Sequence, residues 1–186
     1  MSTDPRERML QATYACVARY GMAKTTVEDV AREARVSRAT VYRYFPGGRD
    51  QLIADTVAWE VGRFFARLAD AIADAPDLPT LLVEGLMYAH RAVDGHEVLQ
   101  KVLQTEPDRL LPSLTVAANR VLVMIRAFLV PYLEQQPLRA GVTVEEASDY
   151  LARMVLSFIG TQGGTDLTDR TKVEALVRRE FLAGLL

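Results

Sequence analysis

The sequence has few of the residues on which most enzymatic and metal chemistry depends. Its 186 residues include one cysteine, Cys16, and two histidines, His90 and His96. A single cysteine excludes an internal disulfide and a thiolate metal cluster within one chain. The sequence also contains no Gly-x-Ser-x-Gly elbow, no phosphate-binding glycine loop and no Glu-x-x-His pair. We therefore expect that the protein is not an enzyme and needs neither a cofactor nor a metal.

Long apolar runs and alternating β patterns are also missing. No run of about 18 uninterrupted apolar residues occurs, so we expect no membrane span. The charged start, residues 4–8, does not resemble a secretory signal, and we therefore expect a cytoplasmic protein. Hydrophobic residues make up 49% of the chain, which is enough for a sizeable core. Their helical spacing between Pro, Gly and Asp breaks predicts an all-α fold.

Positive charge is concentrated at the N-terminal end. Residues 1–50 hold nine Lys and Arg against six Asp and Glu, whereas residues 51–186 hold thirteen against eighteen. The overall charge of −2 therefore conceals a basic N-terminal part that is suited to a polyanion.

The middle of this basic part contains a pattern for a short amphipathic helix. Thr25 is in position to cap it, and Glu28 three residues later completes a capping box. Apolar residues at helical spacing form one stripe: Val27, Val30, Ala31 and Ala34. Arg35 and Val36 then form a turn.

A second short helix follows the turn. Ser37 is a suitable N-cap, and Pro46 with the glycines at 47 and 48 ends the helix near Phe45. Val41 and Phe45, four residues apart, are expected to face inward. The outward face then consists of Arg38, Ala39, Thr40, Tyr42, Arg43 and Tyr44.

This outward face has the chemistry of a DNA-reading helix. An arginine can donate two hydrogen bonds to guanine, and Thr and Ala can contact the thymine methyl group. Hydroxyl groups and a helix N-terminus suit phosphate oxygens. The pair of helices is therefore typical of a helix-turn-helix whose second helix lies in the major groove.

Residues 6–52 resemble the N-terminal DNA-binding domain of TetR-family transcriptional regulators. A helix from about Pro5 to Tyr20 that ends at Gly21, and then residues 25–31, 36–37 and 40–45, follow the order and spacing of that family. The resemblance implies a three-helix domain, residues 1–50, which a long helix joins to a helical effector-binding and dimerisation domain, residues 51–186.

The resemblance also implies roles for individual residues. Thr26, Tyr42 and Tyr44 would contact phosphates, Arg38, Ala39 and Thr40 would contact base edges, and Ser37 could do either. The family usually has a basic residue three positions after Phe45, whereas Arg49 is four positions away. The complete candidate DNA-binding set is Thr25, Thr26, Ser37, Arg38, Ala39, Thr40, Tyr42, Arg43, Tyr44 and Arg49.

The remaining sequence predicts a long helix from about residue 50 to 73 and five later helices. We expect these at about 79–92, 96–103, 114–130, 143–162 and 171–185, the last opened by a capping box of Thr171 and Glu174. The last two helices carry apolar stripes, and the family resemblance implies that they form a homodimer interface: Leu151, Val155, Phe158, Ile159, Val173, Leu176, Val177 and Phe181. The stripes alone fit intramolecular packing equally well.

The length of the chain beyond the first fifty residues suggests a ligand-sensing body. Its composition favours a lipophilic or aromatic effector. The candidate ligand-binding residues are Phe65, Tyr88, His90, Gln100, Leu103, Arg120, Met124, Phe128, Met154, Phe158 and Gln162. Core packing is the alternative role for the apolar members of this set, and a solvated helix face is the alternative for the polar ones.

We therefore predict a homodimeric repressor that a small effector releases from a palindromic double-stranded operator. The alternative is a DNA architectural protein that has little sequence preference and no effector.

Overall fold

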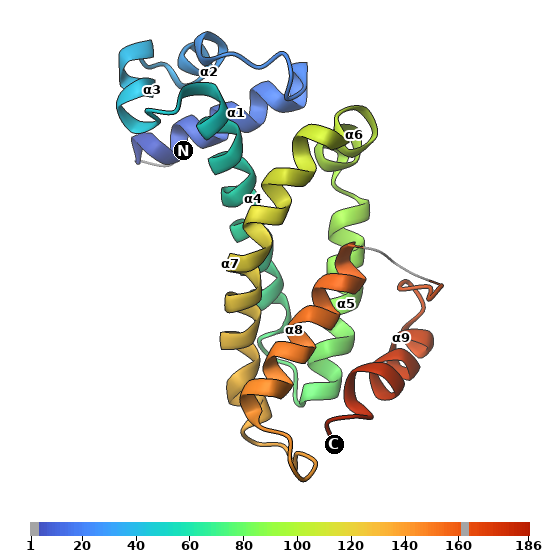
Figure 1. The fold of residues 1–186 in the computed structure, drawn as a ribbon. Coiled ribbons are helices and arrows are strands. Elements are labelled where there is room, and N and C mark those ends of the chain that lie inside the picture. The colour runs from blue at the N-terminus through green and yellow to red at the C-terminus, as the bar shows by residue number, and fades with distance from the viewer. Residues whose placement is uncertain (1–3, 161–163) are drawn as a thin grey trace. The chain divides into compact units, whose positions relative to one another are not determined.

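The computed structural model describes residues 4–160 and 164–186, and all regular elements in these residues are helical (Figure 1). The all-α fold expected from the sequence is confirmed. The helices are α1 (Pro5–Tyr20), α2 (Val27–Ala34), α3 (Arg38–Tyr44), α4 (Gly48–Ile72), α5 (Leu78–Asp94), α6 (Glu97–Thr105), α7 (Pro107–Leu133), α8 (Val144–Gly160) and α9 (Arg170–Leu176), which continues as a π-helical segment (Val177–Leu182).

The chain divides into two compact units. The first unit extends to Arg63 and also contains Glu97–Ala117, and the second consists of Phe64–His96 and Ala118–Leu186. Helices α4 and α7 each contribute residues to both units. The functional division into residues 1–50 and 51–186 stays a prediction.

Helices α1, α2 and α3 pack around a small core in the first unit (Figure 1). Val41 and Phe45 are fully buried there, as the sequence predicted. The stripe of α2 is also buried against α1, and Leu52 from the start of α4 closes the core. We call α1–α3 with the first turns of α4 the head.

Local signals fix where the helices of the head begin and end. Asp4 caps α1, and Gly21, with φ 85°, ends it. The capping box of α2 consists of Thr26 and Asp29, so the predicted pair of Thr25 and Glu28 was one residue too early. The reason is that the Thr25 hydroxyl is buried and donates instead to the Gly21 carbonyl at 2.7 Å.

A second core cluster belongs to the same unit. Val102 of α6 and Leu110 of α7 are buried with Val17, Met22 and Ile53 from the head. Helix α7 begins at Pro107, seven residues before the start that the sequence predicted. Proline is well tolerated at the first position of a helix because that N–H has no partner within the helix.

The second unit is organised around α5, which contacts α8, α9 and the π-helical segment. Asp169, rather than Thr171, caps α9. Five side chains that were predicted to form the dimer interface are buried within this one chain: Leu151, Val173, Leu176, Val177 and Phe181. A side chain that has no exposed surface cannot contact a partner chain. The structure therefore corrects the predicted interface role of these five residues.

Helix α7 stands out for its exposed apolar surface. It is longer than predicted, and by length and composition alone it could cross a membrane, with a mean hydropathy of 1.6. One such helix is weak support for a membrane span. Two of its valines are largely exposed, Val116 at 69% and Val123 at 65%.

Candidate nucleic-acid interface and ligand pocket

The first turn of α3 is fixed by a side-chain cap. The Ser37 hydroxyl accepts a hydrogen bond from the Thr40 amide at 3.1 Å and lies 2.9 Å from the Thr40 hydroxyl. Val41 and Phe45 anchor the opposite side of the helix in the core. Arg38, Ala39, Tyr42 and Arg43 are exposed, so the orientation predicted for this helix is confirmed.

Arg38 is held by an ion pair at the start of α3. Its guanidinium lies 2.8 Å from a carboxylate oxygen of Glu28 on α2, and both side chains are more than half exposed. An exposed pair of this kind is worth little, typically about 0–1 kcal/mol. Glu28 therefore orients the guanidinium without locking it, and a base or phosphate can replace the carboxylate at small cost.

Two aromatic residues of α3 have different surroundings. Tyr42 is 43% exposed, whereas Tyr44 is half-buried and packs against the core of the head. The Arg43 guanidinium lies 5.3 Å from the centre of the Tyr44 ring. Tyr42 therefore has more exposed surface to offer to a phosphate than Tyr44 has.

The start of α2 carries a polar group with altered acidity. The Thr26 hydroxyl donates to Asp29 at 2.6 Å, and the Thr26 amide and Arg32 also contact this carboxylate. The hydrogen bond from the Thr26 hydroxyl is the main reason that the pKa of Asp29 lies below its usual value. Thr26 is exposed, but its hydroxyl already donates to the Asp29 carboxylate and accepts from the Asp29 amide, so the predicted phosphate contact would have to replace the bond to the carboxylate.

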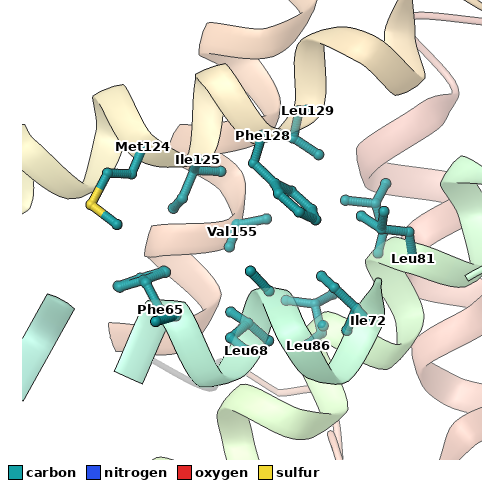
Figure 2. A pocket seen from close by; sticks show the side chains of 14 residues that line it. Phe65, Leu68, Ile72, Leu81, Leu86, Met124, Ile125, Phe128, Leu129 and Val155 are labelled. Carbon is teal, nitrogen blue, oxygen red and sulfur yellow. The ribbon is translucent and has the colours of Figure 1, made fainter. Parts of the chain in front are cut away.

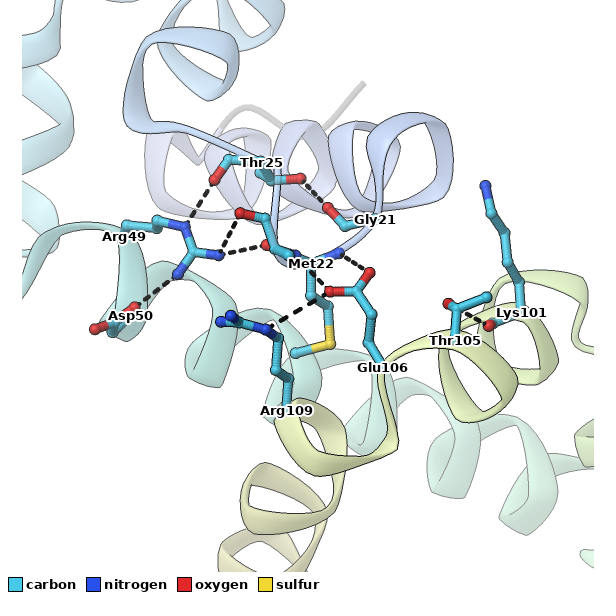
Figure 3. A network of polar contacts seen from close by, with 10 residues as sticks. Gly21, Met22, Thr25, Arg49, Asp50, Lys101, Thr105, Glu106 and Arg109 are labelled. Atoms are coloured by element: carbon cyan, nitrogen blue, oxygen red, sulfur yellow. Dashed lines mark hydrogen bonds and ion pairs between the residues drawn. The ribbon is translucent and has the colours of Figure 1, made fainter.

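Two of the predicted DNA contacts are corrected by the structure. Thr25 is 1% exposed, and its hydroxyl is already used within the head. Arg49 points into the turn after α1, where its Nε donates to the Thr25 carbonyl at 2.8 Å and its Nη2 to the carbonyls of Met22 and Ala23 (Figure 3). Arg49 therefore has a structural role in the head.

Glu106 approaches the same turn from the start of α7. One carboxylate oxygen accepts from the Met22 amide at 2.9 Å, and the other accepts from the Ala23 amide at 2.6 Å (Figure 3). A Cβ on Gly21 would collide with this carboxylate. We call Arg49 and Glu106, together with residues 21–25, the clamp, because one side chain binds the carbonyls of the turn and the other binds its amides.

The clamp joins the ends of two long helices. Arg49 lies in the first turn of α4, and Glu106 immediately precedes α7. The Glu106 side chain is only 16% exposed, so its hydrogen bonds are largely shielded from water. No sequence pattern predicted this contact, because Glu106 is 84 residues from Met22.

The second unit contains a cavity of about 180 Å³ between α4, α5, α7 and α8 (Figure 2). Every side chain that lines it is hydrocarbon or thioether, and three of the lining residues are small: Ala66, Ala69 and Gly85. Met124, which is 45% exposed, marks an open end. The lining residues are Phe65, Ala66, Leu68, Ala69, Ile72, Leu81, Leu82, Gly85, Leu86, Met124, Ile125, Phe128, Leu129 and Val155.

Three of the predicted ligand-binding residues line this pocket: Phe65, Met124 and Phe128. The structure places the other predicted residues that it describes outside the pocket lining. Gln100 and Leu103 belong to the first unit, Arg120 is exposed, and Phe158 packs on Phe181 with ring centres 5.4 Å apart. Tyr88, His90 and Met154 are half-buried outside the lining, and Gln162 falls outside the described residues.

The sequence prediction missed most of the cavity wall for a physical reason. It selected large aromatic and polar residues, whereas eight of the eleven lining residues that it missed are Leu, Ile or Val, which are ordinary core residues in any helical protein. The other three are small: Ala66 and Ala69, one turn apart on α4, and Gly85 on α5. Among the described residues no cluster of three or more His, Cys, Asp or Glu could hold a metal ion.

Comparison with known sequences connects the helix-turn-helix of the head to a protein family. Residues 9–56 match the model described as bacterial regulatory proteins, tetR family. An uncharacterized HTH-type transcriptional regulator of Mycobacterium tuberculosis is 29% identical over 110 residues, which cover 58% of this chain and 54% of that protein. A similar regulator of Mycobacterium bovis is 31% identical over 107 residues, with the same coverage. The chain spans about half the length of these curated relatives.

A comparison of folds extends the likeness to both units. The TetR family repressor AlkX of Dietzia, which is implicated in biodegradation of n-alkanes, has a TM-score of 0.69 with 21% identity, and 95% of each chain is covered. At this identity the likeness establishes the fold alone.

Proposed function

Because the chain belongs to the TetR family of bacterial regulatory proteins, we propose that it is a homodimeric repressor whose two heads bind a palindromic operator and whose pocket takes a small lipophilic or aromatic effector. Regulators of this family are not enzymes, and the proposed activity is entirely one of binding. The observation that carries the proposal is the exposed face of α3, where guanidinium and hydroxyl groups project above a closed core.

The face of α3 supports a division of work between reading and positioning. Arg38, Ala39 and Thr40 occupy the first turn of α3, where side chains reach base edges when the N-terminus of a helix enters the major groove. Tyr42 and Thr26 carry exposed hydroxyls suited to phosphate. On binding DNA, the Arg38 guanidinium would leave the Glu28 carboxylate and donate hydrogen bonds to a base. The Ser37 cap would keep the first turn of α3 rigid during this change.

A dimer is proposed because one short helix reads too few base pairs for strong specificity. Most of the apolar side chains on α8 and α9 are buried within the chain. A dimer contact would therefore have to use side chains that are still exposed to solvent. Val155, Phe158 and Ile159 are only half-buried and remain our candidates among the residues predicted for this role. A cytoplasmic location is part of the same proposal.

The effector response would depend on α4 and α7, because each of these helices carries residues of the pocket and lies next to or contains a residue of the clamp. Helix α4 carries Arg49 in its first turn and Phe65, Leu68 and Ile72 near its end. Helix α7 starts directly after Glu106 and later carries Met124, Ile125, Phe128 and Leu129 of the pocket wall. An effector that fits only one spacing of α4 and α7 would therefore bias the position of the clamp, and with it the DNA affinity.

A binding comparison tests the DNA-binding part. The full chain is titrated at fixed salt against a palindrome from its own promoter and against a random duplex of equal length. We expect at least about a thousandfold preference for the palindrome. Arg38→Ala should reduce that preference, while the exposed Arg67→Ala, in the second unit, should not. Equal affinity for both duplexes would show an architectural protein instead.

The effector part needs a separate readout. A compound that binds the pocket is added to the operator complex, and release of DNA is measured by fluorescence anisotropy. Glu106→Gln should weaken the coupling between compound and DNA without changing the affinity of the compound itself. Pocket binding that leaves DNA affinity unchanged at all concentrations would rule out the effector role.

A further inference from the structure

The lining of the pocket restricts the charge of its ligand. All fourteen residues around the cavity have apolar side chains, and their backbone amides and carbonyls lie within helices α4, α5, α7 and α8. A buried carboxylate or ammonium group would thus have no donor, acceptor or counter-ion, and removing an ion from water without a partner is strongly unfavourable. The same lining gives water too few hydrogen-bonding partners to fill the space well.

The volume restricts the size of the ligand. A cavity of about 150 Å³ lined by Leu, Ile and Phe stays dry and accepts benzene. At about 180 Å³ the pocket has room for a slightly larger molecule with the same chemistry. Phe65 and Phe128 both line the cavity (Figure 2). Because aromatic rings pack favourably in offset or edge-to-face arrangements, these two side chains suit an aromatic ligand.

We propose that the pocket binds a small uncharged hydrocarbon-like molecule of about seven to nine heavy atoms, without a carboxylate, phosphate or ammonium group. The inference rests on the proposed effector role of this pocket and narrows it. The proposal excludes charged amphiphiles whose head group would have to enter the cavity. Met124, at the open end, is the one large lining side chain that is exposed to water.

Three probes of one skeleton separate charge from shape. Toluene, benzoate and benzylammonium share a six-membered ring with one carbon attached, and at pH 7.5 they are neutral, anionic and cationic. Calorimetric titration of the full chain should detect toluene binding with a stoichiometry of one per chain. Benzoate and benzylammonium should bind at least about 100-fold more weakly, because each would bury an unpaired charge.

Matched glycine variants locate the bound probe. A Cβ on Gly85 in α5 would contact the Ile72 side chain at 3.6 Å, an ordinary van der Waals distance, whereas a Cβ on Gly62 in α4 meets nothing within 4 Å. Gly85→Val should weaken toluene binding about tenfold or more by filling the cavity, and Gly62→Val should leave it unchanged. Gly85→Ala, the smaller change, should have an intermediate effect and guards against misfolding of the valine variant.

A charge-swap variant tests the selectivity directly. Met124→Lys places an ammonium group where it can reach water, so the fold should persist. The variant should bind benzoate at least about tenfold more tightly than the wild type does, and Met124→Leu should not. This gain would follow from supplying the counter-ion that the natural lining lacks.

The outcomes distinguish this inference from the proposed function. Benzoate binding as tight as toluene binding, and weakened by Gly85→Val, would overturn the inference and leave the pocket as an effector site. No binding of any probe by a chain that still selects the palindrome would overturn the inference and leave DNA recognition intact. Toluene binding in a chain that prefers no DNA sequence would support the inference while the proposed function fails.

Discussion

Helix α3 and the pocket present their functional side chains in opposite ways. On α3 the polar side chains face water, and only Val41 and Phe45 are committed to the core. In the pocket the candidate side chains are themselves core residues, such as Leu82 and Leu86, each 2% exposed. A substitution on α3 can therefore change binding while the fold persists, but in the second unit stability and ligand binding change together. A short local sequence pattern therefore located the exposed face of α3 but not the pocket.

The largest effect is expected in the core of the second unit. Phe181→Ala should lower the free energy of unfolding by about 3–5 kcal/mol, because the ring is fully buried and packs on Phe158. Chemical denaturation of the full chain provides the measurement. Arg178→Ala, an exposed neighbour in the same segment, is the control and should change little. A stable Phe181→Ala variant with half the wild-type mass in sedimentation would make this residue an interface residue after all.

The next largest effect is expected at the clamp. Glu106→Gln replaces one of two acceptor oxygens by an NH2 group that faces an amide donor of the turn. The loss should be about 1.5–3 kcal/mol of stability in the first unit, the usual range for hydrogen bonds to charged groups. Thermal unfolding monitored through Trp59, which packs against the core of the head, reports it. Glu134→Gln on the surface of the second unit serves as the control, and equal losses in both variants would exclude the clamp.

Substitutions on α3 should separate reading from positioning. Arg38→Ala should reduce discrimination at one base pair by about 1–3 kcal/mol, whereas Tyr42→Phe should weaken binding to every sequence by a similar factor. Affinities for the operator and for single-base variants, measured at one salt concentration, test this contrast. Both variants should unfold like the wild type. Identical affinity profiles for the two variants would disprove the division of roles.

A smaller effect on DNA affinity should follow from removing the ion pair between Arg38 and Glu28. Glu28→Gln removes a carboxylate that competes with DNA for this guanidinium, so we expect affinity to rise by less than about tenfold. The increase should shrink at high salt, because the contribution is electrostatic and exposed. Glu33→Gln, on the same helix but paired with Arg19 at 3.2 Å, provides a charge-matched comparison. A loss of operator affinity in Glu28→Gln would indicate that the ion pair positions Arg38 for reading.

The smallest effect should appear in the pH dependence of the head. The pKa of Asp29 is lowered in the folded state, first by the Thr26 hydroxyl, so its contribution to stability is present above the unfolded value near 3.8. That contribution is lost as pH falls through the folded pKa. Denaturation between pH 2 and 5 should therefore show a shallower loss in Asp29→Asn than in the wild type. Asp108→Asn, exposed in the first unit, should keep the wild-type slope, and equal slopes in all three proteins would contradict the assignment.

Much of the head could be predicted from sequence because its signals are local. Ser37 bonds to Thr40 three residues away, Gly21 and Pro46 mark helix ends, and the α2 stripe repeats at helical spacing. The one-residue error at Thr25 arose because either threonine fits the capping pattern. Only burial of the Thr25 side chain decided between them.

Local sequence patterns are enough to predict the all-helical fold, the helix-turn-helix and the orientation of α3, since each depends on hydrogen bonds and apolar spacing within a few residues. Three features became visible only in the folded chain: Arg49 and Glu106 hold the turn after α1, the apolar stripes of α8 and α9 are largely buried within the chain, and four helices enclose an apolar pocket. These features join segments far apart in sequence. Their partners are chosen by packing, which no local pattern encodes.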